Sequence, residues 1–225
     1  MLKTTIVFAA AAITLLTPTA EVRAEARAVE AHEPIAGYTA GTKAVSPAPI
    51  SLADLQLIEK TLLLGEEDLT YLRKSHDILA PHVDEILDVW YGFVGSNPQL
   101  LKYFSSAAGK PDAAYLGAVK KRFGRWILDT AQANYDQAWL DYQFEIGRRH
   151  HRTKKNKVDK AAAVDNISFR YVNALIYPIT ATLKPFLAKG GAKPEEVEKM
   201  YQAWVKSVLL QVTLWSYPYV KPGDF

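Results

Sequence analysis

Histidine is the residue type in this sequence best suited to bind a metal or to move a proton near neutral pH. The chain contains no cysteine and only two methionines, Met1 and Met200. The lack of cysteine excludes disulfides, zinc–thiolate sites, iron–sulfur clusters and a cysteine nucleophile. Imidazole chemistry must therefore come from five residues: His32, His76, His82, His150 and His151.

The adjacent histidines, His150 and His151, lie at the end of a segment with a helical pattern that begins near Tyr135. Neighbouring residues of a helix point about 100° apart, so a regular helix does not present both rings to one metal ion. His150 lies four residues after Ile146, and His151 lies four residues after Gly147, so the spacing alone leaves the choice open. From the pattern alone, both are interpreted as polar residues near a helix end, where the helix dipole favours a charged imidazole.

Other catalytic motifs are absent: the sequence contains no GxSxG, HExxH, P-loop, GxGxxG or EF-hand pattern. The carboxylate pairs Glu66/Glu67 and Glu195/Glu196 stand at expected helix starts, where the helix dipole accounts for them. A basic run surrounds the histidine pair and consists of Arg148, Arg149, Arg152, Lys154, Lys155 and Lys157. No aromatic residues are interleaved with this run, and the whole chain carries a formal charge of only +3. We therefore expect that the protein does not bind nucleic acid. The run is either a solvated helix end or a set of cations that face the carboxylates of a cofactor.

Helices are the elements expected to position these residues. The chain has 225 residues, 49% of them hydrophobic and 23% charged, which is typical of a globular protein. After Ser51, apolar residues recur with a period near 3.6 and never with a sustained period of two. The sequence therefore predicts an all-α fold.

Individual helix limits follow from caps and breakers. Ser51 and Asp112 are predicted N-caps, and Pro81 is expected in the first turn, or at a kink, of a helix that carries an apolar stripe from residue 79 to 94. One helix is expected over about 135–152, and another over 167–187 with kinks at its two prolines. The last helix should begin at Pro194, and its apolar face is wide enough to need two neighbours.

The N-terminal residues predict a secretory signal followed by an extended arm. Lys3 is followed by an apolar run over 6–16 and then by small residues, so residues 1–24 are interpreted as a secretory signal cleaved after Ala20 or Ala24. Residues 25–50 are expected to form an extended arm, and residues 51–225 the folded domain. We therefore expect an exported protein, periplasmic or extracellular, that does not associate with the membrane after cleavage.

Several segments of the sequence closely resemble the protoglobin family. They are WYGFVGS (90–96), KRFGRWILDT (121–130), YDQAWLDY (135–142), HHRTKKN (150–156), YPITAT (177–182) and LWSYPYV (214–220). The resemblance runs in order over about residues 35–225. It implies a globin fold with an extra N-terminal helix and an extended N-terminal arm, one haem b, and a homodimer formed through the last two long helices.

The resemblance also implies roles for single residues. His150 matches the histidine that binds the haem iron, which makes His151 a neighbour of the site. Arg122 matches an arginine that reaches a haem propionate. The residues that match the pocket on the open side of the haem are Trp90, Tyr91, Phe123, Leu175 and Ile179.

Reversible binding of diatomic gases is the function that this resemblance implies. A single imidazole ligand leaves Fe(II) five-coordinate, with one open face for O2, CO or NO. Tyr91 can donate a hydrogen bond to bound dioxygen, and the protein is expected to act as a carrier, scavenger or sensor rather than as an enzyme. The alternatives are a haem enzyme of the peroxidase or NO dioxygenase type, and an exported helical interaction module without a cofactor.

Overall fold

The computed structural model describes residues 34–225. The predicted signal, residues 1–24, and residues 25–33 of the predicted arm lie outside the described residues. Residues 34–225 form helices and contain no strand beyond two isolated β-bridges, which confirms the prediction of an all-α fold. Within this range, no helix has the combination of length and apolar character that crossing a membrane requires.

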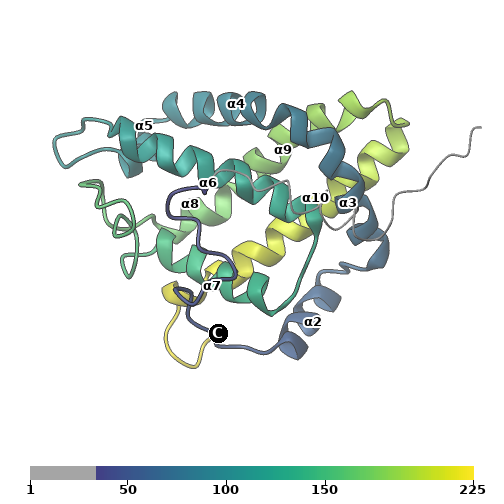
Figure 1. Cartoon of the computed structure of the whole chain (residues 1–225), viewed down its shortest axis with the longest axis horizontal. Helices are drawn as coiled ribbons and strands as arrows, with labels where there is room; N and C mark the ends of the chain where they lie inside the picture. The colour runs from purple at the N-terminus through teal and green to yellow at the C-terminus, as the bar shows by residue number, and fades with distance from the viewer. Residues whose placement is uncertain (1–33) are drawn as a thin grey trace, which may run out of the picture. The chain divides into compact units, whose positions relative to one another are not determined.

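The longer helices are named here in chain order (Figure 1). They are α2 (Leu52–Thr61), α3 (Glu66–Leu79), α4 (Val83–Gly95), α5 (Pro98–Leu101), α6 (Ala113–Gln132), α7 (Gln137–His150), α8 (Phe169–Ala174), α9 (Ile176–Leu187) and α10 (Pro194–Trp215). Short 3₁₀ turns follow several of them, at Ala80–His82, Lys102–Phe104, Ala188–Gly190 and Tyr217–Tyr219.

Side-chain caps fix where the helices begin. Ser51 accepts a hydrogen bond from the backbone N–H of Asp54 at 3.2 Å, and Asp112 accepts one from Tyr115 at 3.0 Å, so both predicted caps are confirmed. Asp136 caps α7 by accepting from the backbone N–H of Trp139 at 2.8 Å. This cap starts α7 at residue 137, two residues later than expected.

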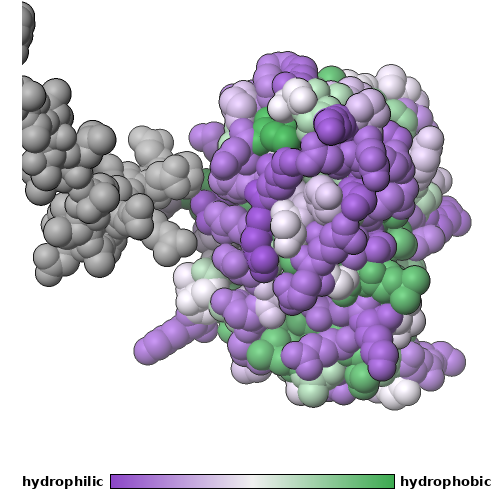
Figure 2. All heavy atoms as spheres, turned by 90° about the vertical axis from the view of Figure 1, so that its right-hand side faces the viewer, coloured by the Kyte–Doolittle hydropathy of each residue, from purple (hydrophilic) through white to green (hydrophobic). Residues whose placement is uncertain are grey.

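Helix α10 lies at the centre of the core, as its wide apolar face predicts. It packs against α3, α7 and α9, while α4 packs on α6 and α9 (Figure 1). Trp204 of α10 is fully buried and donates from its indole N–H to Ser75 of α3 at 2.9 Å. Figure 2 shows the opposite character on the outside, where one face of the molecule carries mostly hydrophilic side chains with scattered hydrophobic ones.

The expected single helix over 167–187 is wrong in one respect. The chain instead forms α8 and α9, which are separated at Leu175. Pro178 has no backbone N–H, so it leaves the carbonyl of Ala174 without a helical donor and its ring crowds that carbonyl. The helix therefore breaks between these residues, while Pro185 is accommodated inside α9.

The start of α4 also differs from the expected pattern. Pro81 lies in the 3₁₀ turn Ala80–His82 and α4 begins only at Val83, although the apolar stripe continues into it. The preceding helix α3 begins at Glu66, so the carboxylate pair Glu66/Glu67 does occupy a helix start.

The described part of the arm, residues 34–50, is held against α6 and α7. Tyr38 donates from its hydroxyl to Asp129 of α6 at 2.6 Å, and its ring contacts Tyr142 of α7 edge-on at 5.1 Å. Arg149 donates to the carbonyl of Gly37 at 2.5 Å. Gly37 has a φ of +77°, and a Cβ there would lie 2.7 Å from a guanidinium nitrogen of Arg122, so this position favours glycine.

Candidate functional site

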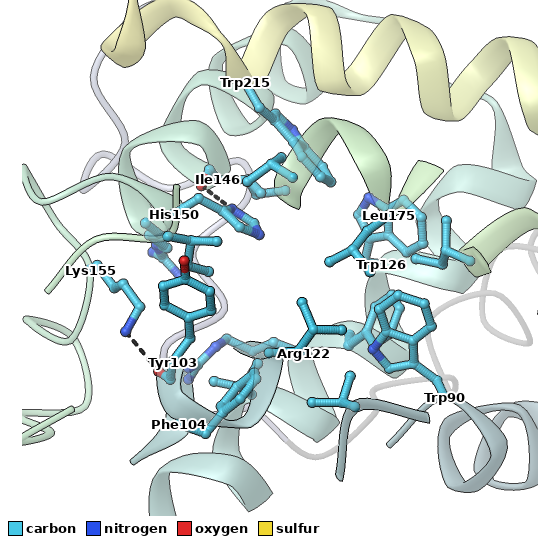
Figure 3. A pocket seen from close by; sticks show the side chains of 18 of the residues that line it. Trp90, Tyr103, Phe104, Arg122, Trp126, Ile146, His150, Lys155, Leu175 and Trp215 are labelled. Carbon is cyan, nitrogen blue, oxygen red and sulfur yellow. Dashed lines mark hydrogen bonds between the residues drawn. The ribbon is translucent and has the colours of Figure 1, made fainter. Parts of the chain in front are cut away.

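A cavity of about 250 Å³ lies between α4, α6, α7, α9 and α10 (Figure 3). Most of its lining side chains are aromatic or aliphatic, so it offers an apolar ligand a surface out of water. The structure brings all seven predicted site residues to this one cavity: Trp90, Tyr91, Arg122, Phe123, His150, Leu175 and Ile179.

His150 provides the imidazole of the cavity. It is the last residue of α7, and its ring points into the open space (Figure 3). Its Nδ1 lies 2.9 Å from the carbonyl oxygen of Ile146, so Nδ1 carries the proton and Nε2 keeps its lone pair. Burial lowers the pKa of His150, so the ring is neutral at pH 7. Nε2 makes no hydrogen bond with any of residues 34–225, and His150 lines the cavity, so Nε2 is available to bind a metal there.

The other described histidines lie elsewhere. His151 follows the end of α7 in an extended conformation and contacts the edge of Tyr219, outside the residues that line the cavity. His76 pairs with Asp77, and His82 pairs with Glu85. His32 lies outside the described residues.

Across the cavity from His150 lies an aromatic wall. Trp90 contacts the edge of Phe123 at 5.8 Å between ring centroids, and Tyr91 contacts the same ring at 6.4 Å. Leu175 and Ile179 pack against the cluster that contains Trp90. The break between α8 and α9 places Leu175 at the cavity, opposite His150 (Figure 3).

Tyr91 brings a polar group to the lining of this apolar cavity. Its ring lies between Phe104 and Phe123, and its hydroxyl makes no hydrogen bond with any of residues 34–225. Burial raises the pKa of Tyr91, which keeps the hydroxyl protonated. A protonated phenol without a partner is a donor that a polar ligand in the cavity can use.

Arg122 lies on the polar side of the cavity, where it is already paired. It makes two hydrogen bonds with the carboxylate of Asp159, at 2.9 and 2.6 Å, and a third with the carbonyl of Ala36 in the arm. Arg149, which also lines the cavity, pairs with Glu145 at 3.0 Å. This side of the cavity therefore combines cations with acceptors from the arm.

Lys155 is a buried member of the basic run, which the sequence alone leaves open as a solvated helix end or as cations that face a cofactor. Its ammonium donates to the carbonyl of Tyr103 at 2.9 Å, to Asn156 at 2.8 Å and to the carbonyl of Val164. Only 3% of the residue is exposed, and burial lowers its pKa to about 8. Three acceptors compensate the charge and tie the loop after α7 to the cavity wall.

Trp215 is a further site residue, which the sequence marks only as part of the apolar stripe of the last helix. Its indole lies flat against the ring of His150, with 5.1 Å between the centroids and 15° between the planes. The close approach depends on Gly147, because a Cβ there would lie 2.9 Å from the Cα of Trp215. The motif LWSYPYV contains Trp215, but nothing in it indicates a contact with the histidine.

Comparison with known proteins places these features in a family. A family model described as Protoglobin matches residues 51–224. This chain belongs to the protoglobin family. Comparison with curated proteins gives no match.

A solved structure supports the globin fold of this protoglobin. The globin domain of a globin-coupled sensor from Geobacter sulfurreducens is similar with a TM-score of 0.58 and 16% sequence identity. The alignment covers 74% of this chain and 97% of that domain. The expected globin fold is therefore confirmed.

Membership of the protoglobin family implies a haem cofactor, and the residues present fit one. The cavity contains one neutral imidazole with a free Nε2, while residues 34–225 contain no group of three or more His, Asp or Glu arranged to hold a metal. A metal bound at His150 therefore needs further donors from a bound group, as a porphyrin provides. The apolar walls suit the flat apolar face of a porphyrin. The cations Arg122, Arg149 and Lys154 line the same cavity, where they can pair with the propionate carboxylates of a haem.

Proposed function

We propose that this protoglobin binds O2, CO and NO reversibly at a haem b held by Nε2 of His150. The observation that carries the proposal is the free, neutral imidazole of His150, which faces a wall of aromatic and aliphatic side chains across the cavity. When bound, the haem would supply a ferrous iron with one open position for a diatomic gas. Trp90, Phe123, Leu175 and Ile179 would exclude water from that open side.

Tyr91 and Arg122 have separate tasks in this proposal. The hydroxyl of Tyr91 would donate a hydrogen bond to dioxygen, which is a better acceptor than CO. Arg122 would bind a haem propionate while it keeps Asp159 as its partner, since one guanidinium has five N–H donors. We further propose that the protein is exported and forms a homodimer through α9 and α10.

An optical experiment tests the function. The purified protein supplied with haem should show a Soret band that shifts when the ferrous form is exposed to CO. A protein that stays colourless after incubation with haem would refute the proposal and favour the cofactor-free alternative. Turnover of peroxide or NO well above that of free haem would instead favour the enzymatic alternative.

A Tyr91→Phe variant tests the proposed donor. The substitution removes the hydroxyl and keeps the ring that packs on Phe104 and Phe123. A hydrogen bond to a charged acceptor contributes about 1–3 kcal/mol, so we expect O2 to dissociate about 5- to 150-fold faster, measured by stopped flow. Dissociation of CO should change little.

A Tyr103→Phe variant is the matched control for this measurement. Tyr103 also lines the cavity, but its hydroxyl already donates to Ser168 at 3.2 Å. O2 should leave this variant at the wild-type rate. Equal O2 dissociation rates in wild type and Tyr91→Phe would show that Tyr91 is not the donor.

A further inference from the structure

The stacked contact between His150 and Trp215 restricts rotation of the imidazole ring about its bond to Cβ. The ring centroids lie 5.1 Å apart, and the ring planes are inclined by 15°. Rotation of the imidazole about its Cβ–Cγ bond would turn its edge toward the indole and break this nearly parallel contact. The stack therefore defines the plane of the His150 ring.

A hydrogen bond on the other side defines the direction of the ring. Nδ1 of His150 donates to the carbonyl of Ile146 at 2.9 Å, which holds the proton on Nδ1 and leaves the lone pair on Nε2. This hydrogen bond alone still permits the ring to rotate about the Nδ1–H axis, which would change the plane of the ring and the direction of Nε2. The bond and the stack together leave one orientation for Nε2.

Trp215 is itself held in place from α7. Its indole N–H donates to Oε1 of Gln143 at 2.9 Å, and Gln143 is only 3% exposed. Gln143 lies seven residues before His150 on the same helix, which is about two turns. Between them, Gly147 lets the backbone of Trp215 approach α7. One helix thus holds both the imidazole and the residue that orients it.

We propose that Trp215, held by Gln143, is a positioning residue that sets the plane of the His150 imidazole and hence the direction of Nε2 in the cavity. This inference rests on the proposed role of His150 as the iron ligand. Trp215 does not touch the reacting gas. It acts through His150, because a metal–ligand bond requires the lone pair to lie on the bond axis.

The test uses a free imidazole in place of the side chain. In a His150→Gly variant, added imidazole should bind haem in the vacated space and rest on Trp215 without a tether to the backbone. In the His150→Gly, Trp215→Leu double variant, we expect imidazole to bind about two- to twelvefold more weakly, measured by optical titration. The Trp215→Phe counterpart keeps an aromatic face and should restore most of the affinity.

A second measurement separates orientation from a purely structural role. In Trp215→Leu with His150 intact, the iron–histidine stretching band in the resonance Raman spectrum should shift and broaden, while Trp215→Phe should stay close to wild type. In the haem-free wild type, the carbon-bound ring protons of His150 should show an upfield NMR shift from the stacked indole. That shift should disappear in Trp215→Leu. Gln143→Leu keeps the indole but removes its acceptor, and should broaden the Raman band as well.

The outcomes distinguish this inference from the proposed function. If His150→Gly binds haem as wild type does and does not respond to imidazole, His150 is not the iron ligand and both proposals are refuted. If imidazole restores the spectrum but binds equally well with Leu or Trp at position 215, only the positioning role is refuted. If Trp215→Leu does not fold, Gln143→Leu takes its place, and an iron–histidine band identical to wild type in that variant would refute the positioning role.

Discussion

Replacing His150 by alanine is expected to remove the bond between the protein and the haem iron. The residue contributes the one imidazole that lines the cavity in residues 34–225, and no other described group there has a free nitrogen lone pair. Loss of groups that merely orient a metal ligand costs about 10–100-fold in metal affinity, so loss of the ligand itself should exceed about 100-fold. The rate of haem transfer to a scavenger protein measures this change.

The neighbouring histidine supplies the control for His150→Ala. His151→Ala removes an imidazole one residue away that contacts Tyr219 outside the cavity. Its optical spectra in the ferric, ferrous and CO forms should match wild type. Far-ultraviolet circular dichroism of both variants checks that the helices are kept. Wild-type haem retention in His150→Ala, with an unchanged ferrous spectrum, would contradict the assignment.

Local interactions explain which parts of this fold can be predicted from the sequence. The caps at Ser51 and Asp112 involve backbone groups three residues away, so a short stretch of sequence contains the whole interaction. The position of the break near Leu175 is less predictable. Pro178 indicates a disturbance of the helix, but either a kink or two helices can result from it.

Long-range packing explains what the sequence pattern leaves open at the site. The choice between His150 and His151 depends on Trp215 of α10, which lies flat on one of the two rings. The pattern within α7 does not contain this contact, and only the resemblance to protoglobins selected His150. Lys155 is a similar case, because one of its three acceptors is the carbonyl of Tyr103, 52 residues away in the chain.

Gly147 is the position where a small substitution should have the largest effect on packing. A Cβ at this residue would meet the Cα of Trp215 at 2.9 Å and its carbonyl oxygen at 3.0 Å, and backbone atoms cannot rotate away. In an exposed helix, glycine-to-alanine replacement stabilises by about 1 kcal/mol. Overpacking costs about 1–3 kcal/mol, so Gly147→Ala should instead lower the free energy of unfolding by up to about 2 kcal/mol. Gly147→Val, which is larger and β-branched, should lower it by roughly 3 kcal/mol or more.

A second glycine provides the comparison for this prediction, because replacement by alanine is expected to change the free energy of unfolding in opposite directions at the two positions. Gly117 lies inside α6 with nothing within 4 Å of an added Cβ, so Gly117→Ala should raise the free energy of unfolding by up to about 1 kcal/mol in urea titrations. A stabilising Gly147→Ala would show that α7 and α10 are not in close contact at this residue. A destabilising one should also disturb the stack on His150, because the backbone that must move carries the indole of Trp215. The iron–histidine band of the haem-loaded variant should therefore change together with its stability.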